Sequence, residues 1–517
     1  MSELFTWQGL AALIGGGLYG AIFGSVPGLT ATLAVALFIP IAFFLDPVLA
    51  LPAIIAITAV AIYAGDVGSV VAKIPGTPAS AAYVEDLYEI ARRRGAKYGL
   101  GISAMGSMVG GLIGTVLLIF AATTLATVAK NFSSFEYFWI AILGLTAGIF
   151  ASSGSSLKAL VSLILGVLFS TVGIDPTLGY ARFDFDNPNM LGGLNFIVAM
   201  IGLFGFSEVL QNVFARGKVE TREVPPTQGS KAFAFFLMPV LLMLRNKLLV
   251  LRSSLIGTFV GFLPGAGADI AAWVASSLQK LTGRRGADDE EADDRVVLAG
   301  TSSNNAAVAS AWIPALSLGL PGDTTTAIVL GVFLMKGITP GPMLFEQQGD
   351  LVMALFGAFL VANVVLLPLF GFLTAYIAAY VVRVPVNLLL AVIAGICVVG
   401  AYAINNNPFD VAVMVLMGVF AFVMRMGGFP LAQVVLGMVL GPILEQSFMV
   451  SAIKSRWNLM AFFDRPIAIG LMLATVLLVV VGLRVKARAT AAQRSAAAQQ
   501  TAAAAAAPPA PSEAPKG

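Results

Sequence analysis

The sequence predicts an all-α polytopic membrane protein of about 12 transmembrane helices, in two inverted repeats with broken or re-entrant Pro-Gly helices. Composition is the first observation behind this fold class: apolar residues make up 58% of the 517 residues and charged residues only 11%. Soluble proteins carry about a quarter charged residues. The second is that uncharged runs long enough to cross a bilayer recur along the chain. The third is that Pro-Gly pairs, which break helices, recur in matching surroundings.

The start of the chain and its rare residue types exclude several classes. The first apolar run begins near Leu10 without a preceding basic segment, which predicts a retained helix and not a cleaved signal peptide. No histidine is present and Cys397 is the single cysteine, which excludes an internal disulfide, a Cys/His zinc cluster and a His-based triad. The formal charge of +3 fits membrane orientation better than nucleic-acid binding.

Polar segments divide the chain into two halves and a tail. We predict a first transport repeat over residues 1–214, a linker over 215–231 and a second transport repeat over 232–484. An Ala/Pro-rich tail over 485–517 cannot build a core and is expected to be disordered. Basic residues from Arg484 onward predict a cytoplasmic C-terminus.

The two halves carry the same pair of elements in the same order. "GAIFGSVPG" (20–28) and "GTFVGFLPG" (257–265) share two glycines and the Pro-Gly pair at identical spacing. A second Pro-Gly element follows in each half, at 73–80 and 319–326. Basic residues follow both elements in the first half but lie between them in the second. If basic loops are cytoplasmic, the halves are oppositely oriented, as in the inverted repeats of secondary transporters.

The broken helices predict a binding site for an anionic solute and a coupling ion. A break in mid-membrane leaves free N–H groups that attract anions and free carbonyl groups that hold cations. Hydroxyl and amide side chains beside the breaks add donors for a carboxylate. The alternative is that the small residues serve close helix packing and the hydroxyls bond the preceding turn. The candidate substrate-binding residues are Pro27, Gly28, Thr30, Thr32, Pro75, Gly76, Thr77, Ser80, Gly265, Ser303, Asn304, Asn305, Gly322, Thr324 and Thr325.

Four ionisable residues near the breaks are candidates for ion coupling: Asp66, Lys73, Asp269 and Asp323. Lys73 can neutralise Asp66, lie on the substrate path or pair with substrate carboxylates. Asp269 and Asp323 can instead cap the half-helices that follow Pro-Gly. No cofactor is predicted beyond a coupling Na⁺ or H⁺, with a possible Na⁺ site near Asp269 and Asn305.

Five segments together resemble a known family, the large membrane subunit of tripartite tricarboxylate transporters (TctA-like). The resemblance covers about Gly16 to Arg484. The segments are "GSVPGLTATLAVALFIP", "KIPGTPASAAYVEDLYEIARRRGA", "LPGAGADIAAWVA", "SSNNAAVASAWIPALSLGLPGDTTTAIVLG" and "GITPGPMLF".

The resemblance implies a multi-pass protein of the bacterial inner membrane that imports citrate-like and other organic anions, driven by an ion gradient and without an ATPase. It also implies two partners, a small four-helix membrane subunit and a periplasmic solute-binding protein. By position, the implied substrate loops are 27–32, 75–80, 264–269, 303–305 and 321–326. Asp66 and Asp323 depart from the family pattern, which predicts a different substrate or a stronger reliance on H⁺ or Na⁺.

The resulting hypothesis is a secondary carrier, elevator-like or rocking, and not an enzyme. A channel or a membrane scaffold is the alternative. A channel predicts rings of like charge or a filter sequence, and the sequence contains neither. An intramembrane enzyme is disfavoured by the missing histidine and metal ligands.

Overall fold

A computed structural model describes residues 2–26, 29–152, 155–175, 177–214, 232–264, 267–283, 291–381 and 386–484. Within these ranges the chain is helical apart from loops and one two-stranded hairpin, which confirms the all-α expectation. The expected linker (215–231) and tail (485–517) lie outside the described residues, as do Pro27, Gly28 and Gly265.

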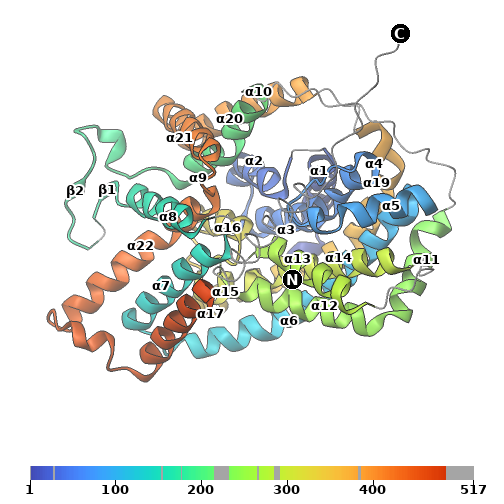
Figure 1. Cartoon of the computed structure of the whole chain (residues 1–517). Helices are drawn as coiled ribbons and strands as arrows, with labels where there is room; N and C mark the ends of the chain where they lie inside the picture. The colour runs from blue at the N-terminus through green and yellow to red at the C-terminus, as the bar shows by residue number, and fades with distance from the viewer. Residues whose placement is uncertain are drawn as a thin grey trace, which may run out of the picture.

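The first half opens with helices that pack in the middle of the molecule (Figure 1). α1 lies along α3, and α6 is a single helix of 34 residues. The elements are η1 (Ser2–Phe5), α1 (Trp7–Ser25), α2 (Ala31–Phe44), α3 (Pro47–Ala64), α4 (Asp66–Ala72), η2 (Ser80–Ala82), α5 (Val84–Arg94) and α6 (Ala96–Ala129).

The second half places its own helices against this group. α14 packs against α12, α13 and the first-half helix α6. The elements are α11 (Ala232–Arg245), α12 (Lys247–Phe262), α13 (Gly267–Thr282), α14 (Ala292–Ser310), α15 (Trp312–Leu318), α16 (Thr324–Met335), α17 (Pro342–Gln347), α18 (Gly349–Val361), the π-helical turn η5 (Ala362–Leu366) and α19 (Leu367–Val381).

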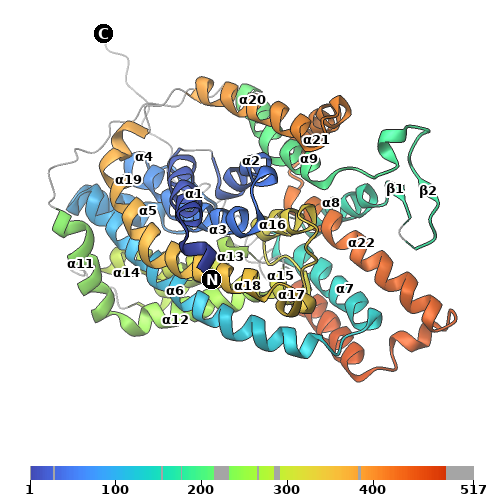
Figure 2. The same ribbon diagram turned by 180° about the vertical axis from the view of Figure 1, so that it is seen from behind.

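The remaining helices of both halves pack with each other outside this central group. α22 contacts α7 and α8 at one end of the molecule, and α21 contacts η4 and α10 (Figures 1 and 2). The elements are α7 (Ser134–Ala151), α8 (Ser156–Ser170), β1 (Gly173–Ile174), β2 (Ala181–Arg182), η3 (Pro188–Met190), α9 (Phe196–Met200), the π-helical turn η4 (Ile201–Phe206), α10 (Ser207–Phe214), α20 (Val386–Asn405), α21 (Pro408–Met426), α22 (Leu431–Lys454), η6 (Leu459–Phe462) and a last helix over Pro466–Arg484.

Among the described residues, seven helices are long and apolar enough to cross a membrane. Six more apolar helices have only 10–17 residues. The chain is therefore a multi-pass membrane protein by length and composition, but the expected count of about twelve spans is not confirmed.

The central helices of the two halves follow the same order. Each half has a helix, a break, a second and a third helix, and then a short helix (α4 or α15). Each short helix ends at a residue in the left-handed conformation, Lys73 (φ 56°) and Gly319 (φ 71°), directly before the second Pro-Gly element. Further helical turns follow, and then one long helix, formed by α6 in the first half and by α18, η5 and α19 in the second.

Contacts between the halves also correspond. The Lys336 ammonium group, at the end of α16, donates to the carbonyl oxygens of Phe43 (2.7 Å) and Leu45 at the end of α2. In the corresponding place, Lys280 near the end of α13 forms an ion pair of 2.7 Å with Asp86 of α5. In each half, the end of the helix that follows the first break (α2 or α13) therefore contacts the helix that follows the second Pro-Gly element of the other half (α16 or α5).

Glycines set how closely the first and third helices approach in each half. A Cβ atom placed at Gly24 of α1 collides with the carbonyl oxygen of Ala61 in α3, and one placed at Gly261 of α12 collides with that of Ala307 in α14. Only a residue without a side chain allows such contact between helix backbones. The packing interpretation of the Gly-x-x-x-Gly spacing is thus correct for these glycines.

Candidate functional site

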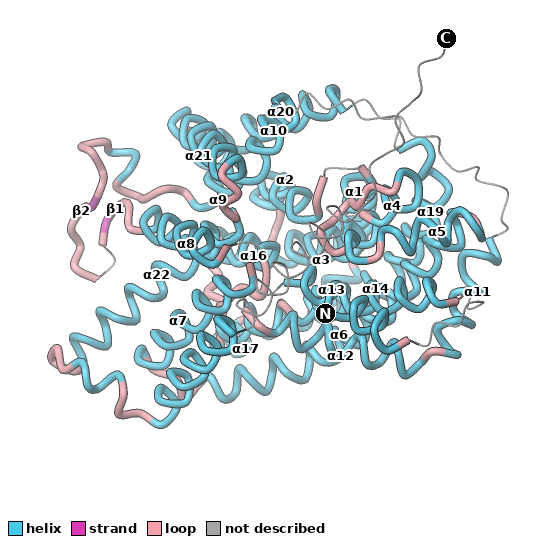
Figure 3. The backbone as a smooth tube through the Cα atoms, viewed as in Figure 1, coloured by secondary structure: helices cyan, strands magenta, loops and turns pink. Residues whose placement is uncertain are grey.

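At each first Pro-Gly element, one helix ends before the element and another begins after it. α1 ends at Ser25, and α2 begins after Thr30, whose hydroxyl caps it by accepting the Leu33 amide at 3.2 Å. In the second half α12 ends at Phe262, and α13 begins at Gly267. Figure 3 shows loop segments among the helices near α3 and α16 as well as at the periphery. The sequence-based expectation of broken helices agrees with these bounds.

The second Pro-Gly elements lead into two capping turns, residues 77–80 and 323–326. In the first turn, Thr77 Oγ1 accepts the Ser80 amide (3.1 Å) and Ser80 Oγ accepts the Thr77 amide (3.0 Å). In the second, Asp323 Oδ1 accepts the Thr326 amide (2.7 Å) and Thr326 Oγ1 accepts the Asp323 amide (2.9 Å). These reciprocal bonds form capping boxes. Asp323 therefore caps α16, the role that the sequence left open as an alternative.

The tips of the broken helices meet the capping turns of the opposite half. The hydroxyl oxygens of Thr32, at the start of α2, and Thr325, at the start of α16, are 3.4 Å apart. In the corresponding place, α13 packs against the turn at 77–80, with Asp269 at its start close to the Ala79 amide. The Trp273 indole donates to the Pro78 carbonyl at 3.1 Å. Both meetings join residues far apart in the sequence.

These pairs form one continuous group, which we call the central polar site: Thr32, Thr77, Ala79, Ser80, Asp269, Asp323, Thr324 and Thr325. A Cβ atom placed at Gly267 lies 3.7 Å from Asp323 Cβ, so the start of α13 also faces the start of α16. The Asp269 side chain is exposed, whereas Thr325 is buried. The site thus has an accessible surface at Asp269.

Tyr83 connects this site to Asp66. Its hydroxyl donates to the Asp66 carboxylate oxygens at 3.1 and 3.3 Å, and Ser103 of α6 donates to the same carboxylate. Asn304 of α14 and Asp269 lie close to the Tyr83 hydroxyl. All partners of Asp66 among the described side chains are therefore neutral.

Lys73 does not neutralise Asp66. Its ammonium group pairs with Glu85 at 3.2 Å, and its side chain is 40% exposed. Lys73, Ile74 and Pro75 are exposed, whereas the corresponding Gly319, Leu320 and Pro321 of the second half are buried. The two second Pro-Gly elements thus differ in accessibility, and Lys73 lies at the accessible one. This ion pair does not test the predicted role of Lys73 on the substrate path.

The amides of α14 are buried and incompletely paired. Asn304 and Asn305 are 3% and 2% exposed, and Asn304 Oδ1 has no hydrogen-bond partner among the described residues. Neither amide atom of Asn305 has one. Ser303, by contrast, donates to the Ala271 carbonyl at 3.0 Å and thereby joins α14 to α13. A buried amide without partners is costly, so Asn305 is the stronger candidate for a ligand contact.

Ion pairs join the two halves at the end of the molecule near α5. Arg94 pairs with Asp294 at 2.8 Å, and Lys280 pairs with Asp86. Burial raises the pKa of Asp86 above its ordinary value, although the hydrogen bond and charge of Lys280 act in the opposite direction. Each pair joins the first half to the second.

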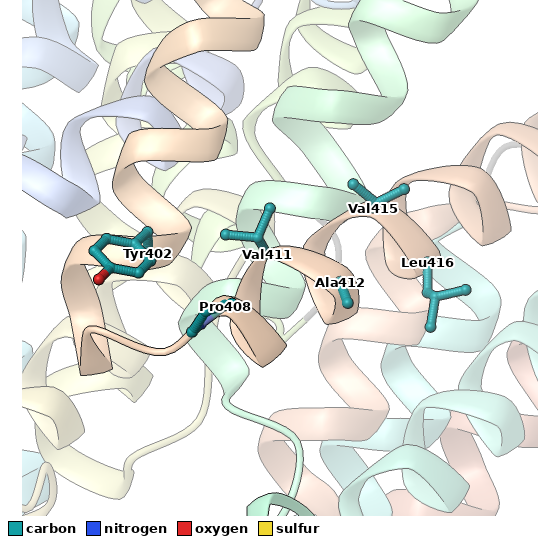
Figure 4. A pocket seen from close by; sticks show the side chains of 6 residues that line it. All are labelled: Tyr402, Pro408, Val411, Ala412, Val415 and Leu416. Carbon is teal, nitrogen blue, oxygen red and sulfur yellow. The ribbon is translucent and has the colours of Figure 1, made fainter.

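Three cavities lie near or outside the site. A small space of about 20 Å³ is lined by Asp323, Thr324 and Gln433 among others. A cavity of about 1040 Å³ lies between α7, α8, α16 and α22, and Arg182 and Glu445 form an ion pair in its wall. A third hollow of about 700 Å³ has an apolar lining from α20 and α21 (Figure 4). No predicted site residue lines this third hollow, whose residues are Tyr402, Pro408, Val411, Ala412, Val415 and Leu416.

Three contributors were not predicted: Tyr83, Ser103 and Trp273. Tyr83 and Trp273 lie in segments that carry the family resemblance, and each is the first aromatic residue after a Pro-Gly pair, which was the available signal. Ser103 lies within a long apolar helix and gives no local signal. Ala79 lies within the implied substrate loop 75–80, although it contributes through its backbone and not through a side chain.

A family comparison covers most of these elements. The model of the tripartite tricarboxylate transporter TctA family matches residues 10–436. The chain belongs to the TctA family. This membership indicates the large membrane subunit of a tripartite tricarboxylate transporter, a transporter component and not a member of an enzyme family.

Two relatives of the chain come from Agrobacterium vitis. One is an uncharacterized 52.8 kDa protein in the TAR-I ttuC' 3' region, 33% identical over 476 residues, which are 90% of this chain and 92% of the relative. The other is an uncharacterized protein in the TAR-II ttuC' 3' region, 33% identical over 220 residues, which are 42% of this chain and 89% of the relative. No solved structure matches the chain.

Proposed function

We propose that the chain is the large membrane subunit of a binding-protein-dependent secondary transporter that imports organic anions by symport with H⁺ or Na⁺. The proposed substrates are tricarboxylates, dicarboxylates or related carboxylates. One observation carries the proposal: in each half, the helix that follows the first Pro-Gly break meets the capping turn of the opposite half. Such broken helices in opposed halves are how secondary transporters build their binding sites.

The corresponding contacts support two inverted repeats that open the central polar site alternately to the two sides of the membrane. Thr32 meets Thr325 in one place, and Asp269 meets Ala79 in the other. The exposure of 73–75 and the burial of the corresponding 319–321 are then two states of one element, open in the first half and closed in the second. We propose that transport reverses this difference, by an elevator-like or rocking motion.

Three carboxylates are the proposed coupling groups. Asp66 is 1% exposed and contacts only neutral hydroxyl donors, so a bound proton or cation relieves the cost of its burial. Asp269 and Asp323 lie at the site itself. A Na⁺ ion near Asp269 and Asn305 can use the unpaired Asn305 Oδ1 as a ligand.

The proposed setting is the bacterial inner membrane, with the C-terminus in the cytoplasm. The proposed partners are a small four-helix membrane subunit and a periplasmic solute-binding protein. Co-purification with the products of neighbouring genes tests both partners. Absence of both types of gene beside the coding sequence, together with no co-purifying membrane subunit, counts against the assembly.

The test of transport is uptake into proteoliposomes that contain the full chain with its co-expressed partners. The probes are ¹⁴C-labelled lactate, malate and citrate, each supplied with outside-to-inside Na⁺ and H⁺ gradients. We expect saturable uptake of at least one acid that stops when ionophores collapse both gradients. Uptake that persists without either gradient contradicts the coupling, and unsaturable conductance favours a channel.

A further inference from the structure

At each capping turn of the central polar site, the second half supplies a carboxylate and the first half supplies a threonine. In the second half Asp323 caps its own turn, and the neutral Thr32 comes from the first half. In the first half the neutral Thr77 caps the turn, and the carboxylate of Asp269 comes from the second half. The amides that attract anions in a broken helix are thus already in contact with a resident carboxylate at both turns.

No described basic side chain offsets these charges. None of Asp66, Asp269 and Asp323 forms an ion pair with a described Lys or Arg. The cations closest in sequence are engaged elsewhere, because Lys73 pairs with Glu85 and Lys280 pairs with Asp86. The carboxylates of the site are therefore balanced only by neutral donors, such as the Tyr83 and Ser103 hydroxyls at Asp66.

A separate observation concerns α14, the helix that Ser303 joins to α13. It carries Asn305, whose amide nitrogen is a neutral donor with no partner among the described residues, in a side chain that is 2% exposed. Thr324, beside Asp323, keeps a half-buried hydroxyl. These groups suit one carboxylate and a neutral polar substituent, because each further carboxylate needs donors of its own and approaches a resident one.

We infer that the transported solute is a monocarboxylate with neutral polar groups, and that dicarboxylates and tricarboxylates are disfavoured. This inference rests on the proposed function and narrows its substrate class. It holds for either coupling ion, because every additional negative charge on the solute requires an additional proton or cation in the same site. Like charges placed together are the usual means of rejecting a wrong ligand.

The experiment compares three 2-hydroxy acids that differ in carboxylate number: lactate, malate and citrate. Uptake by the full chain with its partners is measured in proteoliposomes at pH 7.5, where all three acids are ionised. We expect lactate uptake at least about tenfold faster than malate uptake and faster still than citrate uptake. Malate or citrate uptake equal to lactate uptake overturns the inference but leaves the proposed function intact.

Two variants tie the preference to the resident charges. Asp323→Asn keeps an oxygen that accepts the Thr326 amide, so α16 stays capped while one charge is lost. Asp269→Asn likewise keeps an acceptor for Ala79. Because both residues are also proposed coupling groups, the ratio is measured as exchange of labelled for unlabelled acid, which needs no ion gradient. We expect the malate-to-lactate exchange ratio to rise about tenfold in either variant, which is the effect of removing one like charge beside the second carboxylate.

The matched control is Asp293→Asn, because Asp293 pairs with Arg93 outside the site. Its exchange ratio should equal that of the unaltered chain. An unchanged ratio in both site variants, with thermal unfolding unaltered, overturns the inference. Failure of the unaltered chain to take up any of the three acids contradicts the proposed function and the inference together.

Discussion

Gly261 shows what a single missing side chain does for the arrangement of the site. Its backbone lies against Ala307 of α14, in the helix that also carries Asn304 and Asn305. We expect Gly261→Ala to lower stability by about 1–3 kcal/mol, because the new methyl group forces the two helices apart. Thermal unfolding in detergent measures the change.

The control for that variant is Gly15→Ala, since a Cβ atom at Gly15 of α1 meets nothing within 4 Å. This control should match or exceed the stability of the unaltered chain, because alanine favours the helix. Equal unfolding temperatures for the two variants would show that the close approach at Gly261 is not needed.

Asp323 combines a folding role with a place in the central polar site. Its carboxylate accepts the Thr326 amide at 2.7 Å, so Asp323→Ala should cost about 1 kcal/mol through the lost cap. Asp323→Asn should cost little, because its side-chain oxygen accepts the same bond. The unfolding temperatures of the two variants distinguish the contribution of the capping hydrogen bond from that of the negative charge. Equal losses of stability in both variants would mean that the charge itself stabilises the fold.

At the scale of elements, the contact between α2 and α16 can be locked. The hydroxyls of Thr32 and Thr325 are 3.4 Å apart, so cysteines at both positions are expected to form a disulfide on oxidation. In a Cys397→Ser background, we expect oxidation of the double variant to abolish uptake and reduction to restore it. The reason is that the proposed alternating-access motion separates the start of α2 from the start of α16. Each single cysteine variant is the control, and full activity of the oxidised double variant would show that the tips stay together during transport.

The contact of α5 with α13 makes a second prediction at this scale. Asp86 is buried and Lys280 is its ion-pair partner at 2.7 Å, with a side chain that is 37% exposed. We expect Lys280→Ala to destabilise the protein by about 1–2 kcal/mol, since a buried carboxylate loses its partner near the surface. Reversal of both charges should recover part of the loss in thermal unfolding, and no recovery would mean that the pair does not join the halves.

At the scale of the whole molecule, local chemistry explains which features the sequence predicts. Pro-Gly pairs and capping residues act on their own neighbours, so the helix breaks and the candidate role of Asp323 as a cap follow from short segments. The pairing of Thr32 with Thr325 and of Asp269 with Ala79 depends on how distant helices pack, which no short segment encodes. The same reason explains why the partner of Lys73 is Glu85 and not Asp66.

The proposed orientation of the whole molecule follows from α6, which connects two charged ends. Its 34 residues extend about 51 Å at 1.5 Å per residue, more than the roughly 30 Å of a bilayer core. α5, with Arg92 to Arg94, precedes it, and Lys130 directly after it pairs with Glu346 of α17. The positive-inside rule then places the basic α5 end in the cytoplasm and Glu346 on the opposite side.

Cysteine labelling in cells checks that orientation. Glu89 and Glu346 have side chains 46% and 50% exposed, whereas the native Cys397 is fully buried. We expect a membrane-impermeant maleimide to label Glu346→Cys in intact cells but Glu89→Cys only after permeabilisation. Labelling of both from outside would place the two ends of α6 on one side of the membrane. That result would contradict the proposed orientation, in which α6 joins a cytoplasmic α5 to α17 on the opposite side.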